Sequence, residues 1–552
     1  MIALLYAEPI VTGLMMDYPL TLTHILERSA KLYPRKEIAS RLDDGSMHRY
    51  TYAAFYRRVH RLAHVLQELG VQPGDRIGTL CWNSYRHLEL YFAVPCYGAV
   101  LHTLNLRLAP DQLSFIINHA EDRIIFVDAS LLPILEAIRG ELKSVRQIVV
   151  LDDALIDAAP ETRYSWPELD ERTAAATCYT SGTTGNPKGV LYTHRALFLH
   201  SYGICMADTF ALSERDTILQ LVPMFHANGW GIPFAGIMTG SRMVFSGRLL
   251  QPADIAFLIQ NERATFAAGV PTLWMGLYSY LQSNPHDISS LRTIAAAGSA
   301  LPRQFIELYQ KRYGIRFMLA WGMTETTPIA TVTALKSDLE KLPESERFDV
   351  LARHGMPLAG VDIRIVDESG NELRWDGTTM GELQIRGPWI TSGYYNDPRS
   401  EDAFMDGWFR TGDVATVDAE GYIQIMDRTK DLVKSGGEWI SSVDLENAIM
   451  AHPKVMEAAV IGVFHPKWQE RPIACIAPLP QYKDQITKLE ILDFLASRVA
   501  KWWLPDDIVF IEAVPKTSVG KFNKRALRQQ FQNYKTDSEE NESTGLGHSV
   551  GN

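Results

Sequence analysis

Alternating helical and strand patterns in the first part of the chain constrain its fold more than any other feature of the sequence. Residues 52–70 carry apolar side chains at helical spacing, and the apolar stretch 77–81 follows them. A second helical stretch, 87–98, leads into "AVLHTLN", and a third, 112–120, leads into "RIIFVD". This alternation is typical of doubly wound parallel sheets, which bind ligands at the carboxyl ends of their strands.

Four apolar segments run directly into polar or glycine-bearing clusters. They are "AATCY" before "TSGTTG", "TILQLVP" before "MFHANGW", "LRTIAAAG" before "SALP", and "RFMLAW" before "GMTETTP". Strand ends that meet at one edge of a sheet form a crevice there. We therefore expect these four clusters to line one binding crevice.

The cluster "YTSGTTGNPKG", residues 179–189, has the composition of a loop that wraps its backbone around phosphate. It is not a Walker A loop, because Lys188 follows Pro187 and precedes Gly189, where that motif has glycine and then Ser or Thr. Loops rich in Ser, Thr and Gly are also typical of plain surface turns. Taken alone, the loop leaves both interpretations open.

Length and charge bound the class of protein. A chain of 552 residues exceeds the size of a single core and predicts several domains. The formal net charge of −11 argues against a nucleic-acid-binding or anionic-membrane-binding surface. The five cysteines are scattered without a CxxC pair, so we expect reduced core residues and neither a disulfide framework nor a zinc site. With no recognisable secretory signal and no membrane-spanning run, the expected location is cytoplasmic.

The later part of the chain changes pattern. From about residue 360, short strands such as "VDIRIV" and "GELQIR" alternate with turns, and after "DRTKD" a compact α+β region follows. The predicted fold is a multidomain α/β protein: a large N-terminal domain of doubly wound sheets with a small β-rich subdomain, hinged to a small α+β C-terminal domain. The predicted bounds are 1–429 for the first domain, with its subdomain at about 355–429, and 430–535 for the mobile C-terminal domain. The polar tail at 536–552 is expected to be disordered.

Six motifs, in this order, resemble those of the adenylate-forming superfamily of acyl-CoA synthetases, luciferases and peptide-synthetase adenylation domains. They are "YTSGTTGNPKG", "PMFHANGW", "WGMTET", "GWFRTGD", "DRTKDLVKSGGEWIS" and "PKTSVGK". The resemblance covers about 19–527, and "VPMFHANGW" and "KSGGEWIS" look most like medium- and long-chain fatty acyl-CoA ligases. A peptide-synthetase module is disfavoured, because a polar tail follows the last motif.

The resemblance implies an AMP-forming ligase that makes a carbon–sulfur bond. ATP converts a carboxylic acid into acyl-AMP and pyrophosphate, and CoA then takes the acyl group and releases AMP, with Mg²⁺ neutralising phosphate charge. A fatty acid of medium or long chain is the first expectation for the acid. The alternatives are a short, branched, thioether or aryl acid, or a catalytically silent adenylate-binding protein. The partners are small molecules and not nucleic acid, and the resemblance leaves room for a homodimer and for weak peripheral membrane contact.

The resemblance also assigns the phosphate and metal residues. The phosphate loop would use Thr180, Ser181, Gly182, Thr183, Thr184, Gly185 and Lys188. Thr183 and Glu325 would hold Mg²⁺, whose preferred ligands are oxygens. The catalytic set would be Lys521, Thr324, Glu325 and His226. A flexible lysine such as Lys521 can neutralise charge on both reactants during adenylation.

The nucleotide-binding residues implied by the resemblance lie in four motifs. They are Gly298, Ser299, Trp321, Gly322, Asp413, Arg428, Lys434 and Trp439. Trp321 stands where the family often has tyrosine, and an indole there either stacks on adenine or packs as a core residue. Asp413 as acceptor and Arg428 as donor suit the ribose hydroxyls.

Lys430 matches the family hinge, about which the small domain would rotate between the two half-reactions. After rotation, Gly436 and Gly437 would line the channel for the narrow thiol arm of CoA. The acyl pocket would lie at His226 and Trp230, where Trp230 either gates a tunnel or packs in the core. Small residues nearby, among them Gly229, Gly231, Ala235 and Gly236, are expected to leave volume for an alkyl chain, as are Ala295, Ala296 and Ala297.

Overall fold

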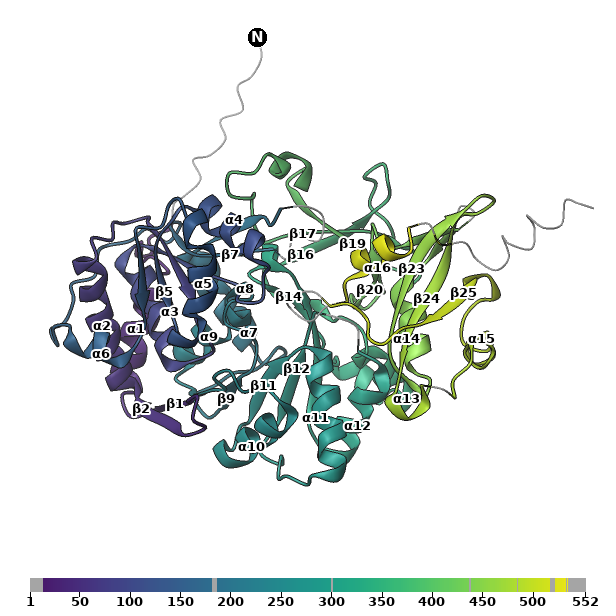
Figure 1. The fold of residues 1–552 in the computed structure, drawn as a ribbon, viewed down its shortest axis with the longest axis horizontal. Coiled ribbons are helices and arrows are strands. Elements are labelled where there is room, and N and C mark those ends of the chain that lie inside the picture. Colours follow the sequence, from purple (N-terminus) through teal and green to yellow (C-terminus); the bar gives the residue numbers. More distant parts are fainter. Residues whose placement is uncertain are drawn as a thin grey trace, which may run out of the picture.

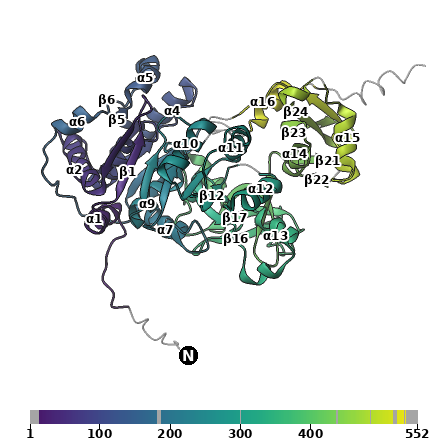
Figure 2. The same ribbon diagram turned by 90° about the horizontal axis from the view of Figure 1, so that it is seen from below.

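The computed structural model describes residues 13–180, 186–298, 301–435, 438–483, 485–516, 522–532 and 534. Two large sheets and their helices form the N-terminal part of the molecule, and a small C-terminal unit lies beside them (Figures 1 and 2). A third, antiparallel sheet and a fourth sheet in the C-terminal unit complete the described architecture. The predicted fold class, a large α/β domain with a small α+β domain, is confirmed.

The nine-stranded sheet has the order β15-β14-β13-β12-β11-β9-β10-β1-β2. Its central strands pair in parallel, and β2, β14 and β15 close its edges antiparallel. The strands are β1 (Glu37–Arg41), β2 (Met47–Thr51), β9 (Thr217–Gln220), β10 (Arg242–Phe245), β11 (Phe266–Gly269), β12 (Thr293–Ala296), β13 (Arg316–Gly322), β14 (Ile329–Val332) and β15 (Met356–Pro357). Apolar runs such as "TIAA" form fully buried strands because helices cover both faces of a parallel sheet.

The six-stranded sheet has the order β6-β5-β3-β4-β7-β8. Its strands are β3 (Arg76–Leu80), β4 (Val100–Thr103), β5 (Asp122–Val127), β6 (Gln147–Val150), β7 (Ala174–Tyr179) and β8 (Gly189–Thr193). All neighbours are parallel except β7 and β8, which pair antiparallel on either side of the predicted phosphate loop. Of the four predicted strand-end clusters, one therefore follows a strand of this sheet and three follow strands of the nine-stranded sheet.

Buried helices pack against the two sheets. They include α1 (Leu22–Leu32), α2 (Tyr52–Glu68), α3 (Tyr85–Tyr97), α7 (His194–Cys205) and α9 (Ile232–Thr239). Thr51 and Ser84 cap α2 and α3, since each side chain accepts a hydrogen bond from a first-turn amide of its helix. No helix among the described residues is both long and apolar enough to cross a membrane.

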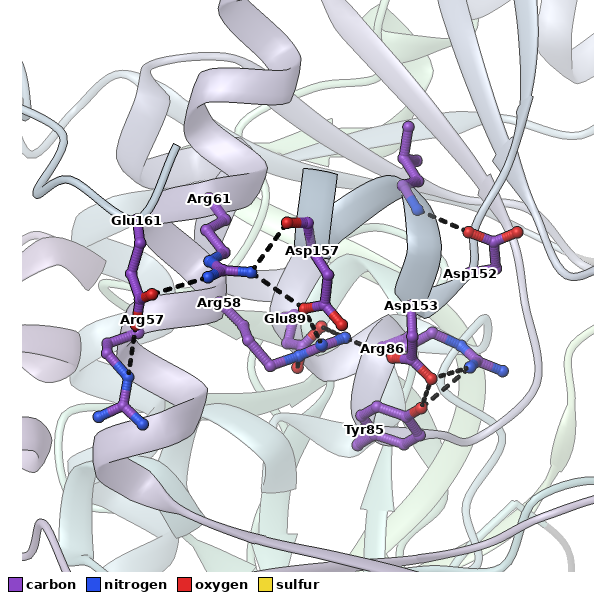
Figure 3. Close-up of polar contacts among 11 residues, drawn as sticks. Arg57, Arg58, Arg61, Tyr85, Arg86, Glu89, Asp152, Asp153, Asp157 and Glu161 are labelled. Atoms are coloured by element: carbon purple, nitrogen blue, oxygen red, sulfur yellow. Dashed lines mark hydrogen bonds and ion pairs between the residues drawn. The ribbon is translucent and has the colours of Figure 1, made fainter. Parts of the chain in front are cut away.

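An ion-pair network joins α2 and α3 to the short helix α6 (Asp153–Ala158), as Figure 3 shows. Glu89 of α3 is fully buried, and its Oε1 lies 2.6 Å from Nε of Arg58 on α2. The same guanidinium reaches Asp153 through Nη2 at 2.6 Å. A buried carboxylate is tolerated only when it is paired, so Arg58 is what allows Glu89 to lie between these helices.

The remaining strands form two smaller sheets. The antiparallel one contains β16 (Asp362–Val366), β17 (Gly381–Arg386), β18 (Phe404–Met405), β19 (Trp408–Val417) and β20 (Ile423–Arg428). The C-terminal one contains β21 (Val433–Ser435), β22 (Glu438–Ile440), β23 (Val455–His465), β24 (Gln469–Pro478) and β25 (Asp507–Phe510). Helices α14 (Ser442–Met450), α15 (Lys488–Ala496) and α16 (Lys524–Gln530) accompany the C-terminal sheet, which has its own apolar core.

Candidate functional site

A cavity of about 1060 Å³ lies where the strand ends of the large domain face the C-terminal unit. Six of the predicted site residues line it: Gly298, Trp321, Gly322, Asp413, Arg428 and Lys430. Its opposite wall is formed by residues of α14 and α16, including Glu446, Lys524 and Arg528. Residues more than 100 positions apart in the sequence therefore meet around one space of the size that a nucleotide needs.

Asp413 is a buried acidic group in this wall that two partners hold. It pairs with Arg428 across neighbouring strands β19 and β20, and Arg428 Nε lies 2.5 Å from Asp413 Oδ1. The indole Nε1 of Trp321 donates a hydrogen bond to Asp413 Oδ2 at 2.9 Å. Only 2% of Asp413 is exposed, and the nearby carboxylate raises the pKa of Arg428. A fixed carboxylate beside a guanidinium offers the acceptor and the donor that a ribose diol requires.

The turn after β7 is closed by hydrogen bonds between its two ends. The amide of Thr180 donates to the carbonyl of Lys188 at 2.9 Å, and the amide of Lys188 donates to Thr180 Oγ1 at 3.1 Å. Burial, and secondarily Arg399, lowers the pKa of Lys188. Five predicted phosphate-loop residues, Ser181, Gly182, Thr183, Thr184 and Gly185, lie outside the described residues.

Glu325 lies on a one-turn 3-10 helix, Thr324–Thr326, directly after β13. Its side chain is buried, with 5% of the residue exposed, and Oε1 accepts a hydrogen bond from the Tyr394 hydroxyl at 2.7 Å. The carbonyl of Thr324 accepts a hydrogen bond from Tyr192 at 2.7 Å. Glu325 is therefore not a solvated surface side chain. One buried tyrosine donates a hydrogen bond to its carboxylate, and another donates to the main chain of its turn.

The donor set at Glu325 fits a magnesium ion that arrives with a nucleotide. A carboxylate oxygen is a hard ligand, and Mg²⁺ in phosphate-transfer sites takes one or two carboxylates and completes its shell with substrate phosphates and water. Within the part of the chain that the structure describes, no group of three His, Cys, Asp or Glu residues forms a ready-made metal cage. Glu325, with Thr183 of the phosphate loop as predicted, would hold such an ion.

Three residues near the phosphate side were not predicted from the sequence. Tyr394 and Tyr192 contact the Glu325 turn, and the Arg399 guanidinium donates to the carbonyl of Asn186 at 3.2 Å. Tyr394 stands in the polar, aromatic segment "SGYYNDP", which Arg399 directly follows and which is typical of any turn, while Tyr192 stands in strand β8. Tyr394 is 69 positions from Glu325, so only the fold brings the two together.

The predicted acyl residues sit in an unusual turn. His226 precedes α8 (Ala227–Trp230), and residues 227–231 all have positive φ, from 35° at Ala227 to 70° at Gly231. Trp230 is buried, with 4% exposed, and belongs to the main apolar core. This placement agrees with the alternative in which Trp230 packs in the core, and a gate at Trp230 stays a prediction.

The expectation that small residues leave open volume here is wrong at two glycines. A Cβ built on Gly231 would lie 2.5 Å from Nδ1 of His200, and one built on Gly236 would lie 2.3 Å from Sδ of Met243. Side chains from α7 and β10 thus already fill the space beside these glycines. Small residues in a sequence permit close packing as readily as they permit a cavity.

The other predicted residues lie apart or outside the described residues. Lys434 and Trp439 face each other across β21 and β22, with Lys434 Nζ 4.4 Å from the indole centroid, and neither lines the cavity. Lys430 lines it. Ser299, Gly436, Gly437 and the predicted catalytic Lys521 fall outside the described residues.

Comparison with known proteins shows the family of the chain. The model of the AMP-binding enzyme family matches residues 26–395, and that of the AMP-binding enzyme C-terminal domain matches 444–521. The chain is 49% identical over 532 residues to a long-chain-fatty-acid–CoA ligase of Thermus thermophilus, covering 94% of this chain and 97% of that protein. It is 42% identical over 535 residues to a 3-methylmercaptopropionyl-CoA ligase of Ruegeria lacuscaerulensis, covering 94% and 98%.

Among solved structures, an anthranilate CoA ligase in complex with anthranoyl-AMP superposes with a TM-score of 0.83 at 26% identity. The match covers 93% of this chain and 98% of that one. The predicted resemblance is confirmed over nearly the whole chain. The protein belongs to the AMP-binding enzyme family.

Proposed function

We propose that this protein is an AMP-forming fatty acid–CoA ligase that prefers medium- or long-chain acids. In the first half-reaction a carboxylate oxygen attacks the α-phosphorus of ATP, the bond to the β-phosphate breaks, and pyrophosphate leaves. In the second, the CoA sulfur attacks the acyl carbon, the carbon–oxygen bond to AMP breaks, and the thiol proton is lost to solvent. The observation that carries the proposal is the buried Asp413, fixed by Arg428 and Trp321 at the wall of the cavity.

Four of the predicted site residues that the structure describes have a part in this chemistry. Asp413 and Arg428 bind the ribose, which holds the α-phosphate at a fixed place in the cavity. Lys188 binds the β- and γ-phosphates and stabilises the charge on departing pyrophosphate. Glu325 would hold Mg²⁺, whose charge would offset that of the triphosphate and so lower the repulsion that the incoming carboxylate meets. These assignments follow the resemblance, and the burial of Asp413 and Glu325 supports them.

The C-terminal unit supplies Lys521 for adenylation. Lys516 and Phe522 flank the stretch 517–521, pair with each other, and both line the cavity. The two described residues that flank the stretch with Lys521 thus lie at the cavity, which supports the proposed role of this stretch. With Lys430 as hinge, rotation would withdraw Lys521 and bring Gly436 and Gly437 to the CoA thiol. Lys521→Ala should then abolish pyrophosphate release while thioester formation from supplied acyl-AMP persists.

A thioether acid is the second candidate substrate. The 42% identity to a 3-methylmercaptopropionyl-CoA ligase favours it, because that relative covers the chain as fully as the fatty-acid ligase does. Both candidates use the same nucleotide chemistry and differ only in the acyl pocket. A cytoplasmic location and a homodimer belong to the same proposal.

A panel of carboxylic acids tests the proposal. AMP release from ATP and Mg²⁺ would be measured for acids from acetate to long-chain fatty acids, together with aryl and thioether acids, with and without CoA. We expect CoA-dependent turnover with kcat/KM highest on a medium or long alkyl chain. A maximum on the thioether acid would favour the second candidate, and ATP binding without AMP from any acid would indicate a catalytically silent adenylate-binding protein.

A further inference from the structure

One short segment of the chain contacts both parts of the predicted phosphate and metal site. The amide of Thr391 donates to the carbonyl of Glu325 at 2.8 Å, and the amide of Tyr395 donates to the carbonyl of Gly189 at 2.9 Å. Gly189 directly follows Lys188, so the segment joins the end of the phosphate loop to the turn that carries Glu325. The distance between these two loops thus depends on the 391–395 backbone.

Tyr394, inside this segment, contacts both predicted residues with different parts of one side chain. Its hydroxyl donates to Glu325 Oε1 at 2.7 Å. The face of its ring lies beneath the ammonium of Lys188, with Nζ 4.3 Å from the ring centroid. Tyr394 is 9% exposed and Glu325 5% exposed, so the hydrogen bond between them is made away from bulk water, whereas Lys188 is half-buried.

The hydroxyl has a consequence for metal binding. Mg²⁺ demands near-ideal octahedral geometry, and partners that hydrogen-bond to a ligating carboxylate fix its orientation and contribute to affinity. With Oε1 occupied by Tyr394 and the main chain held by Thr391, the Glu325 carboxylate is fixed and presents its other oxygen. The conformational entropy of the Glu325 side chain is lost when the protein folds, so binding of the nucleotide and metal does not have to order it.

The ring has a separate consequence for phosphate binding. An aromatic face attracts an ammonium ion without neutralising it, unlike a carboxylate partner. Lys188 is therefore held in place beside Glu325 while its full charge stays available to phosphate oxygens.

We propose that Tyr394 is a positioning residue of the adenylation step: its hydroxyl orients Glu325 for Mg²⁺, and its ring holds Lys188 for the triphosphate. The inference rests on the proposed roles of Glu325 and Lys188. Tyr394 lies in neither of the two motifs that contain Lys188 and Glu325.

Metal binding without turnover tests the hydroxyl. Mn²⁺ would replace Mg²⁺, and its binding to the full-length protein saturated with a non-hydrolysable ATP analogue would be followed by electron paramagnetic resonance. Tyr394→Phe keeps the ring and loses the hydroxyl, and we expect the Mn²⁺ dissociation constant to rise by about tenfold. The matched control is Tyr395→Phe, which removes a hydroxyl from the adjacent tyrosine and should leave the constant unchanged. Melting temperatures of all variants would verify that they fold.

A double-mutant cycle with Glu325→Gln separates positioning from general structure. If Tyr394 acts through Glu325, Tyr394→Phe will add no further loss in the Glu325→Gln background. Wild-type Mn²⁺ affinity in Tyr394→Phe, or losses that multiply in the double variant, would overturn the proposal. So would a Glu325→Gln protein that binds Mn²⁺ normally, since Glu325 would then not be the ligand.

A larger substitution tests the ring. Tyr394→Leu removes the aromatic face, and we expect weaker binding of the metal-free ATP analogue than in Tyr394→Phe; equal binding by the two variants would refute the ring's role. These measurements need no acid or CoA. If the double-mutant cycle shows Tyr394 and Glu325 coupled in Mn²⁺ binding but the protein forms no AMP, the ligase function is contradicted and the role of Tyr394 still holds.

Discussion

The indole nitrogen of Trp321 donates a hydrogen bond to Oδ2 of Asp413 at 2.9 Å, while Arg428 pairs with the other carboxylate oxygen. Trp321 thus lines the cavity and also holds Asp413 through its N–H group. A tyrosine or phenylalanine ring could stack at this position, but phenylalanine could not make this bond. The relationship gives Trp321 a role that stacking on adenine alone does not describe.

Trp321→Phe should weaken AMP binding by about tenfold, because a hydrogen bond to a charged group is lost and Asp413 is less firmly oriented. Isothermal titration calorimetry would measure the dissociation constant. Trp274→Phe is the matched control, since Trp274 is also buried and its Nε1 donates to the carbonyl of Gly269 instead of to the site. Equal loss in both variants would mean that the effect is one of folding.

Arg58→Met should lower the free energy of unfolding by about 3–5 kcal/mol, because it leaves the buried Glu89 carboxylate without its partner. Arg57→Met on the same helix serves as control. Arg57 is largely exposed and lies 3.6 Å from Glu161, so its loss should cost at most about 0.5 kcal/mol. Urea denaturation would compare the two, and a similar small effect for both would contradict the importance assigned to the buried pair.

Gly231→Ala should destabilise the protein more than Gly314→Ala does. Both glycines have φ near 70°, so each substitution forces an alanine into the left-handed region at about 1–2 kcal/mol. Only Gly231 faces a neighbour, His200, whereas a Cβ on Gly314 would meet nothing within 4 Å. The difference in unfolding free energy should be about 1–3 kcal/mol. Equal costs would show that the contact between His200 and Gly231 is loose.

Acid should destabilise the protein in part through His200. Burial lowers the pKa of this fully buried histidine from 6.5 to about 3, so the folded state binds its proton less readily than the unfolded state does. Its contribution is therefore present above pH 6.5 and is lost as pH falls toward 3, by up to about 1.4 kcal/mol per pH unit.

His200→Gln should reduce this acid sensitivity, since glutamine keeps an acceptor for the amide of Ile329 but does not titrate. Melting temperatures between pH 7.5 and 5 would be compared with those of His286→Gln, which alters a histidine on a surface loop. If the melting temperature of His200→Gln falls with pH as steeply as that of the wild type, His200 is protonated in the folded protein or does not control the loss of stability in acid.

The sequence predicted the fold class and six of the residues that line the cavity, because both depend on local patterns. Helix and strand periodicity located elements of both large sheets, although helix boundaries shifted by a few residues, as at α2, which ends at Glu68 and not at 70. Asp413, Arg428 and Glu325 stood in contiguous motifs. Tyr394 did not, since its contact with Glu325 exists only once two loops distant in sequence have met.

The acyl pocket shows a different limit. Gly231 and Gly236 suggested open volume, but the side chains that occupy that volume, His200 and Met243, come from elements elsewhere in the chain. Small residues in a sequence indicate that neighbouring side chains can come close. They do not indicate which side chains of other elements fill the space beside them.

In the proposed reaction, an acid is activated as an adenylate before CoA reacts. Rapid mixing of the enzyme with ATP, Mg²⁺ and a fatty acid, without CoA, would measure pyrophosphate and AMP in the first turnover. We predict a burst of pyrophosphate equal to the enzyme concentration while the adenylate stays bound, followed by release of AMP and formation of acyl-CoA when CoA is added. Formation of ADP and phosphate, or the absence of any pyrophosphate until CoA is present, would contradict the account.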